Sequence, residues 1–528
     1  MNLKNTLFLL ALVTVFWSCG DDDESPTLIT LDALEGEWIT QSWITGPSGS
    51  MGLLVISFSE VTADAEITAL SPNSWGFTCN EVTLRNLEPA SNSISGEGLI
   101  RSTGGGSEWV PTTITLSGDE LSIAFDCVGC SNENLVLTRV TGSATASVTI
   151  ENDILEPLTL TKVNCESDAI DYLVTDWIDV EEVLTIEPGV NIAFAANAGF
   201  FVNDVLGNGA LVAVGTASEP VTFTGEQKTK GFWRGISVQS NDVRNELNYA
   251  IVEYAGSDPI SSFGGINIRG GVAIDAVSGG FDGSLKVNNS IIRDNDGHGL
   301  IVEEGTLLRE FSNNEFENNT DAAVRIDANN VGSINGDSDF IGSNGVDGVE
   351  INATGSPIHD ITDDATWPAL AGGAVYRVVQ SFDVRAQLTL MPGAVIEFDA
   401  NQTMYFEQDF SGPNDGIIIA RGTSTNPITF TGVAKTPGYW QGLVIQSNSV
   451  LNEMDHCIVE YGGSDVVADQ AANIVLDKDG AFTAPDLIVT NSTIRNSAGC
   501  GIVVDQFGGN LTQSGNTFES NPSGNICD

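Results

Sequence analysis

Short stretches in which apolar and polar residues alternate recur along most of the chain, separated by Gly, Asn, Ser and Asp. A period of two is typical of β-strands that bury one face. Residues 54–58 and 114–116 show the pattern, and Gly118-Asp119 predicts a hairpin turn before the next alternating stretch, 121–125. Antiparallel strands that close on themselves are the economical fold for a segment of this size. We therefore predict a small β-barrel over residues 31–140.

From residue 145 onward the alternation continues and the sequence repeats itself. Residues 215–225 (GTASEPVTFTG) return 207 positions later as 422–432 (GTSTNPITFTG), and 231–258 return as 438–465 with 16 of 28 positions identical. Within each copy, similar short segments recur about every 20–25 residues. Stacked short strands at this period indicate a parallel β-helix, whereas an array of β-sandwiches would lack the short period. We predict one over 145–528, with copies at about 165–365 and 366–528.

Two resemblances extend this fold prediction. The segments LTIEPG (184–189), GFWRG (231–235) and YAIVEYAG (249–256), with their second copies, resemble the right-handed parallel β-helix (pectin-lyase-like) proteins of bacterial surfaces. The Gly-x-Trp that ends at Trp38 and the strand that ends at Arg139 resemble lipocalin-like domains of bacterial lipoproteins. That resemblance implies that Trp38 closes one end of the barrel and that Arg139 covers its ring by a cation–π contact. Both a barrel that holds a small apolar ligand and a filled barrel fit this resemblance.

The N-terminal segment predicts the protein's location. Lys4 precedes an apolar run at 7–17 that is too short to span a bilayer as a mature helix, followed by Ser18-Cys19-Gly20. This resembles the bacterial lipoprotein signal, which implies that 1–19 is a signal peptide whose final cysteine, Cys19, is acylated. The acidic segment 20–30 reads as a solvated tether and resembles the surface-export tag of Bacteroidetes lipoproteins. We expect an outer-membrane, lipid-anchored and surface-exposed protein.

The charge balance narrows the set of partners. The chain has 71 acidic and 20 basic residues, which gives a formal charge of −51. Such a field repels nucleic acid and anionic membrane surfaces. It also repels polyuronates and sulfated glycans unless cations intervene. The acidity also fits a protein that is simply kept soluble outside the cell.

The eight cysteines complete no metal site, although Cys127-x-x-Cys130 has the spacing of a zinc or redox pair. Cys127-x-x-Cys130 lacks the second pair or the histidine that a zinc site needs, so a disulfide from Cys79 to one of the pair is the better interpretation in an exported protein. Cys500 and Cys527 lie about one coil apart, but strict alternation points them to different faces, so we do not expect them to pair.

Several polar and aromatic residues recur at equivalent places in both copies. Asn295, Asn318, Asn319 and Asn496 are expected to form side-chain ladders at the turns. A second set could line two equivalent sugar or calcium sites, with packing and turn roles as the alternative. This set comprises Trp233, Tyr254 and Asp258 in the first copy and Trp440, Tyr461 and Asp465 in the second.

The resemblance to β-helix enzymes also raises the question of catalysis. Gly297-His298-Gly299 looks like the polygalacturonase Gly-His-Gly, but the accompanying acidic elements, 319–321 and 363–364, follow it in the wrong chain order. The second copy has Gly499-Cys500-Gly501 at the same place, which favours a structural junction. Arg293 recurs as Arg495, which favours a scaffold salt bridge. No catalytic residue is assigned, and His298 and Arg293 stay as candidates.

We expect no cofactor and no dedicated metal site, although the acidic loop at 359–364 could hold Ca²⁺ or serve only as a connector. The predicted function is that of a surface-anchored binding or adhesion lipoprotein that presents its β-helix to a glycan or a protein. The alternative is a polysaccharide lyase or glycoside hydrolase that acts in a groove of the β-helix.

Overall fold

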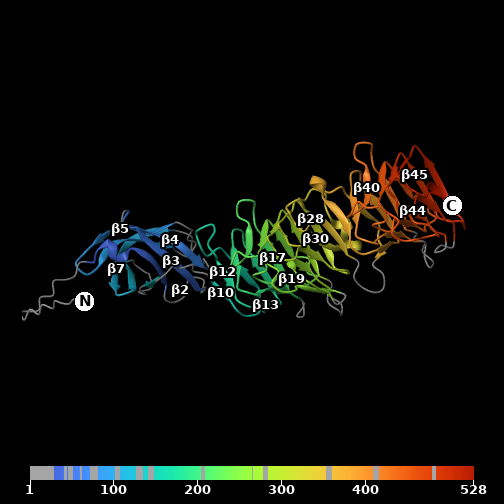
Figure 1. Ribbon diagram of the computed structural model, residues 1–528. Coiled ribbons are helices and arrows are strands. Elements are labelled where there is room, and N and C mark those ends of the chain that lie inside the picture. The colour runs from blue at the N-terminus through green and yellow to red at the C-terminus, as the bar shows by residue number, and fades with distance from the viewer. Residues whose placement is uncertain are drawn as a thin grey trace, which may run out of the picture. The chain divides into compact units, whose positions relative to one another are not determined.

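The computed structural model describes residues 29–40, 44–45, 51–59, 62–71, 81–101, 107–126, 135–140, 148–203, 209–263, 266–276, 283–352, 360–407, 416–478 and 483–528. The chain divides into two compact units, with the boundary between Ala144 and Thr145. Each is built almost wholly of β-strands (Figure 1). The predicted fold class, a small antiparallel barrel followed by a long parallel β-helix, is confirmed.

The first unit is a closed antiparallel barrel. Eight strands follow the order β1-β9-β8-β7-β6-β5-β4-β3, and β1 pairs back onto β3, so the sheet has no free edge along this ring; the short β2 adds to β3. A 3₁₀ helix, η1 (Leu31–Leu34), precedes it. The strands are β1 (Gly36–Thr40), β2 (Ile44–Thr45), β3 (Met51–Ser59), β4 (Asp64–Ser71), β5 (Val82–Pro89), β6 (Ile94–Arg101), β7 (Ser107–Ser117), β8 (Glu120–Phe125) and β9 (Leu135–Arg139).

The Trp–Arg arrangement expected at one end of the barrel is present. The Trp38 side chain is completely buried, and its indole N–H donates to the carbonyl oxygen of Leu34 at 2.8 Å. The guanidinium carbon of Arg139 lies 4.3 Å from the centre of the Trp38 ring. Arg139 also donates to the carbonyl oxygens of Ala33 and Glu35, which ties the last strand to η1. The contact therefore joins the two ends of the barrel sequence.

In the second unit, every full coil of the chain contributes three short strands, one to each of three parallel sheets. The first copy fills a seven-stranded sheet, a six-stranded sheet and the first part of a 13-stranded sheet, which we call the long sheet. The seven-stranded sheet contains β10 (Val148–Ile150), β12 (Tyr172–Val174), β15 (Asn191–Phe194), β18 (Val221–Gly225), β21 (Ala250–Glu253), β26 (Ile291–Arg293) and β29 (Glu315–Glu317). The six-stranded sheet contains β11 (Leu158–Leu160), β14 (Val183–Ile186), β17 (Ala210–Val214), β20 (Glu246–Asn248), β25 (Ser284–Asn288) and β28 (Leu307–Ser312).

The long sheet continues without interruption from the first copy into the second. It contains β13 (Trp177–Val180), β16 (Gly199–Val202), β19 (Gly235–Val238), β24 (Gly270–Ile274), β27 (His298–Val302), β30 (Ala322–Asp327), β31 (Val346–Asn352), β34 (Val375–Val378), β37 (Val395–Phe398), β40 (Ile428–Gly432), β43 (Cys457–Glu460), β46 (Thr493–Arg495) and β49 (Thr517–Glu519). Because this sheet spans both copies, they form one continuous β-helix. Its strands run from green through yellow to red in Figure 1.

The second copy fills two further sheets beside the long sheet. The second-copy seven-stranded sheet contains β32 (Asp360–Ile361), β35 (Phe382–Val384), β38 (Met404–Phe406), β41 (Leu443–Ile445), β44 (Ala472–Leu476), β47 (Cys500–Val504) and β50 (Gly524–Cys527). The second-copy six-stranded sheet contains β33 (Ala365–Trp367), β36 (Gln387–Leu390), β39 (Ile417–Arg421), β42 (Glu453–Asp455), β45 (Asp486–Thr490) and β48 (Asn510–Ser514). Two 3₁₀ helices, η2 (Ala328–Ser333) and η3 (Ala371–Gly373), and the hairpin of β22 (Ser261–Phe263) and β23 (Ile266–Ile268) complete the unit.

The two copies are out of phase by one face of the coil. β18 and β40 carry the repeated VTFTG and ITFTG, but β18 lies in the first-copy seven-stranded sheet and β40 in the long sheet. β21 and β43, and β26 and β46, show the same exchange. With three strands to a coil, equivalent surfaces of the two copies therefore face different directions, about a third of a turn apart.

The shift arises between β30 and β31. After β30 the chain forms η2, which packs against β28, and then a short extended piece in which Asp339 bridges Glu315 of β29. Phe340 stacks on Phe316 with ring centres 5.7 Å apart, so this piece occupies the next place in the first-copy seven-stranded column. The chain thus adds one strand position before the second copy begins. β31, the next strand, lands on the long sheet.

Polar ladders support the corners of the coil. Asn295 donates from its side chain to the side-chain oxygen of Asn319 at 3.0 Å, and Asn319 donates to that of Asn344 at 2.9 Å. The backbone N–H of Asn295 also donates to Asn319. The predicted ladder of Asn295 and Asn319 is confirmed, and Asn344 extends it by one coil. Buried backbone groups that the corners free from the sheets are satisfied in this way.

The prediction that Cys500 and Cys527 do not pair is wrong, because they form a disulfide with Cα atoms 6.2 Å apart. Cys500 stands at the corner where β47 begins, and the strict alternation does not hold there. Cys500 and Val503 both join one buried apolar cluster, whereas Ile502, which pairs with Ile526, does not belong to it. In the strand register Cys527 pairs with Val503, and it packs against that same cluster. Cys19, Cys79, Cys127 and Cys130 lie outside the described residues.

Candidate functional site

The repeated arginines hold repeated carboxylates. Arg293 donates to Glu253 at 2.8 Å and Arg495 donates to Glu460 at 2.7 Å, each across neighbouring strands. Although burial disfavours its charge, hydrogen bonds from Thr224 and Arg293 keep the pKa of Glu253 below its usual range. Because both copies build the same pair, these arginines act as cross-strand ties. They lie on different faces of the coil.

The two repeated tryptophans are completely buried. Trp233 stacks on Phe194 and Trp440 on Phe398, with ring centres 4.1 Å apart in both cases. The indole N–H of Trp233 donates to the carbonyl oxygen of Glu253 at 2.8 Å, and that of Trp440 donates to the carbonyl oxygen of Glu460 at the same distance. A sugar ring stacks on an exposed aromatic face, and these rings expose none. We therefore leave both tryptophans out of the surface considered below.

The other repeated candidates stand at turns. Tyr254 and Tyr461 have positive φ values of 68° and 67°, a conformation that a tight corner imposes. Asp258 is well exposed and lies 3.7 Å from Arg234, whose counterpart in the second copy is Gln441. Asp465 instead accepts from the backbone N–H of the next residue. Asp258 and Asp465 therefore have different partners in the two copies. The repeated residues of the two copies also face different directions, because the copies are one face out of phase.

His298 lies beside an open polar cavity on the long sheet. Its Nδ1 accepts from the backbone N–H of Ala322 at 3.2 Å, so the neutral ring carries its proton on Nε2. Nε2 lies 3.9 Å from a carboxylate oxygen of Asp321, whose side chain is 56% exposed. Burial lowers the pKa of His298 to about 3, so the ring stays neutral at ordinary pH.

We call this cavity the junction pocket, because the coils that form it meet where the copies join. Its volume is about 450 Å³, and it opens across β27, β30, β31, β34 and β37, which are neighbours in the long sheet. The residues that line it are His298, Thr320, Asp321, Ala322, Gly345, Val346, Glu350, Arg377, Val379 and Asp399. Small-molecule sites in proteins commonly have volumes of about 300–1,000 Å³.

The charged side chains at the pocket alternate in sign along the long sheet. Register places Arg325, Glu350, Arg377 and Glu397 beside one another on successive strands. Arg325 contacts Glu350, and Arg377 donates to Asp399 at 2.8 Å. Burial raises the pKa of Glu350 although Arg325 opposes the change. The pocket thus lies on a ladder of paired charges.

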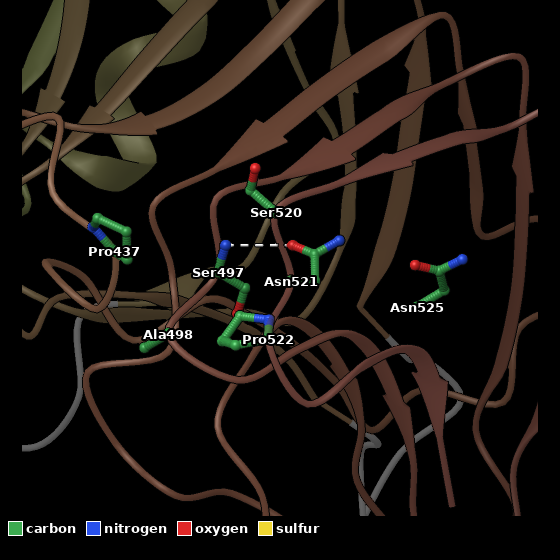
Figure 2. Close-up of a pocket in the computed structure, with 7 residues that line it drawn as sticks. All are labelled: Pro437, Ser497, Ala498, Ser520, Asn521, Pro522 and Asn525. Atoms are coloured by element: carbon green, nitrogen blue, oxygen red, sulfur yellow. Dashed lines mark hydrogen bonds between the residues drawn. The ribbon is translucent and has the colours of Figure 1, made fainter.

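The second copy has a cavity of its own near the last coils of the β-helix, shown in Figure 2. Ser497 donates from its backbone N–H to the side-chain oxygen of Asn521 at 3.1 Å. The volume is about 490 Å³, and its lining is Pro437, Ser497, Ala498, Ser520, Asn521, Pro522 and Asn525. None of these side chains is ionisable. Cys500 and Ser523 stand where the first copy has His298 and Asp321. Neither Cys500 nor Ser523 lines this cavity, so it is not the counterpart of the junction pocket.

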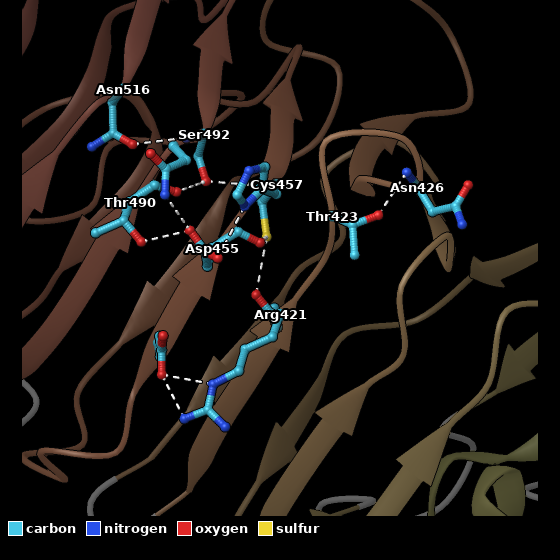
Figure 3. Close-up of polar contacts among 12 residues, drawn as sticks. Arg421, Thr423, Asn426, Asp455, Cys457, Thr490, Ser492 and Asn516 are labelled. Carbon is cyan, nitrogen blue, oxygen red and sulfur yellow. Dashed lines mark hydrogen bonds and ion pairs between the residues drawn. The ribbon is translucent and has the colours of Figure 1, made fainter.

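A separate polar network surrounds Asp455, the residue before His456; Figure 3 labels Asp455. Asp455 accepts from Thr490 at 2.7 Å and from Asn491 at 2.8 Å, and His456 Nδ1 lies 2.9 Å from it. Partial burial opposes ionisation, yet these hydrogen bonds hold the pKa of Asp455 below its usual range. The neighbouring Cys457 is a free, buried thiol whose pKa burial raises, so it is not a nucleophile. The network ties a corner of the coil.

The described part of the chain holds no group of three His, Cys, Asp or Glu side chains arranged for a metal ion. Among the same residues, no helix has the length and apolar composition of a membrane span. Comparison of the chain with protein-family models, curated proteins and solved structures found no match.

Sequence reasoning found His298 and noted Asp321 but missed Glu350, Arg377 and Asp399. These three residues come from three successive coils. No repeated motif marks these residues in the sequence, because they lie where the copies join. His359 of the acidic loop lies outside the described residues.

Proposed function

We propose that this protein is a binding or adhesion lipoprotein, anchored through acylated Cys19 and displayed at the cell surface, whose β-helix contacts a glycan or a surface protein. The observation that supports the proposal most directly is the junction pocket. It combines donors and acceptors in an open cavity on a rigid sheet, and its charged groups are held in place by cross-strand partners. Rigid, pre-positioned polar groups lower the entropic cost of binding.

The test is to screen the protein without residues 1–19 against a glycan array, while following release of reducing ends and of unsaturated products. We expect saturable binding of one glycan class without turnover. An absence of binding to any glycan, together with retained binding to intact cells of a partner strain, would leave only the protein-partner form of the proposal. Lack of binding to both would refute it.

One observation favours a glycoside hydrolase as the second candidate. Glycosidases use a carboxylic acid with a raised pKa beside a second carboxylate. Burial raises the pKa of Glu350, and Asp321 and Asp399 line the same cavity. Release of reducing ends that Glu350→Gln abolishes would establish this candidate. The Arg325–Glu350 ion pair argues against the hydrolase, because it already engages the carboxylate.

The anchor is tested separately by metabolic labelling with a radioactive fatty acid. We expect label in the wild-type chain and none in Cys19→Ala, and we expect added protease to remove the protein from intact cells. Label that persists in Cys19→Ala would refute acylation at this residue.

A further inference from the structure

The junction pocket is a specialised feature of the first copy and the join, because the repeat does not require its charged residues. In the second copy, Cys500 and Ser523 stand in place of His298 and Asp321. In the second copy Cys500 instead forms a disulfide with Cys527, so that corner is held together differently. His298 and Asp321 are therefore particular to the first copy.

The charges of the pocket disfavour an anionic ligand. Three carboxylates line it, from Asp321, Glu350 and Asp399. Two are matched by guanidinium groups, Glu350 by Arg325 and Asp399 by Arg377, while Asp321 lies beside a neutral histidine. One negative charge is left, on a chain of formal charge −51. A uronate would be repelled by this remaining charge and by the net negative charge of the chain. A compact cation would be repelled by Arg377 within the same cavity.

The uncharged hydrogen-bonding groups suit a polyol. His298 presents Nε2–H as a donor, since its Nδ1 already accepts from Ala322. Asp321 presents an acceptor on an exposed side chain 3.9 Å away, and the Thr320 hydroxyl, which donates to the carbonyl oxygen of Asn295, adds a second acceptor. Neighbouring hydroxyls of a sugar each donate and accept, so one diol can satisfy a donor and an acceptor placed side by side.

We propose that the junction pocket binds a neutral, hydroxyl-rich sugar unit, with Asp321 and His298 as the groups that contact one diol. This inference rests on the proposed function and deepens it, since it names the class of glycan and the site. A neutral sugar makes its hydrogen bonds without breaking the Arg325–Glu350 and Arg377–Asp399 pairs. The ladder stays intact as the frame of the site.

The test is calorimetric titration of the chain without residues 1–19 at 0.15 M salt. The probes are maltotetraose, mannotetraose and galactotetraose as neutral oligosaccharides, and trigalacturonate as the anionic one. The variants are Asp321→Asn, Thr320→Val and the control Asp337→Asn, which removes the same charge from an exposed turn outside the pocket. Unchanged melting curves show that each variant is folded.

We expect at least one neutral probe to bind and trigalacturonate not to bind. Asp321→Asn should weaken binding about tenfold or more, because a hydrogen bond to a charged group is lost, while Asp337→Asn should leave the affinity unchanged. A neutral probe that binds equally to wild type and Asp321→Asn, or trigalacturonate that binds as tightly, would overturn the inference but leave the proposed function standing. Binding of no glycan at all, here and on the array, would overturn both.

Discussion

Glu303 makes the stability of the β-helix depend on pH. Its side chain is 3% exposed and follows β27, with Asp275 and Asp327 at the matching places after β24 and in β30. Ser261 donates to it at 2.6 Å. Burial raises the pKa of Glu303 to about 7, Asp275 and Asp327 add to the effect, and Arg325 opposes it. The folded protein therefore holds this carboxyl protonated at mildly acidic pH.

The magnitude follows from linkage. The unfolded chain ionises the group near its ordinary value of 4.5, whereas the folded chain ionises it near 7. The contribution to stability is therefore complete below about pH 4.5, and it is lost as the pH rises through about 7. The total loss is about 3 kcal/mol, of which about 2–3 kcal/mol falls between pH 5 and pH 8.

The assay is denaturant unfolding of wild type and Glu303→Gln at pH 5, 6, 7 and 8. The amide keeps the shape and an acceptor for Ser261 but cannot ionise. We expect Glu303→Gln to gain stability relative to wild type as the pH rises, reaching about 2–3 kcal/mol more at pH 8 than at pH 5. The mutant Asp337→Asn, altered at an exposed turn, should show no such gain. Parallel pH profiles for wild type and Glu303→Gln would refute the reasoning.

Two further predictions concern the packing of the second copy. Trp440→Ala should lower the free energy of unfolding of the β-helix by about 3–5 kcal/mol, because it leaves a cavity beside Phe398 and removes a buried donor. Denaturant unfolding measures this, and a loss below about 1 kcal/mol would contradict it. Cys527→Ser should cost about 3 kcal/mol from a closed loop of sequence separation 27 and speed amide exchange in β50. Exchange in β50 as slow as in wild type would show that the disulfide is dispensable.

The coil itself was predictable because its signals are local. Each strand alternates apolar and polar residues, and each corner carries residues such as Asn295 and Asn319 whose side chains stack on the next coil. Such features need only the sequence of one strand or one corner. The contact between Trp38 and Arg139 was expected from the resemblance to lipocalin-like domains, and the structure has it.

The site was not predictable in the same way. His298 could be found from a motif, but Glu350, Arg377 and Asp399 are brought to it by register between coils. The register between coils depends on how many residues each coil has at its corners. The Cys500–Cys527 disulfide was mispredicted because the alternation does not hold at the corner before Ile502.

The sequence alone determined that residues 145–528 form stacked coils in two copies, because identical residue types recur at the spacing of one coil and of one copy. Only the tertiary structure decided how the copies are joined. One added strand position, around Asp339 and Phe340, turns the second copy by one face and carries the long sheet through the junction. The physical reason is that a coil has three faces of similar strands, so the local pattern is compatible with any of them. The choice is made by where the connecting chain finds partners for its backbone and a stack for its aromatic ring.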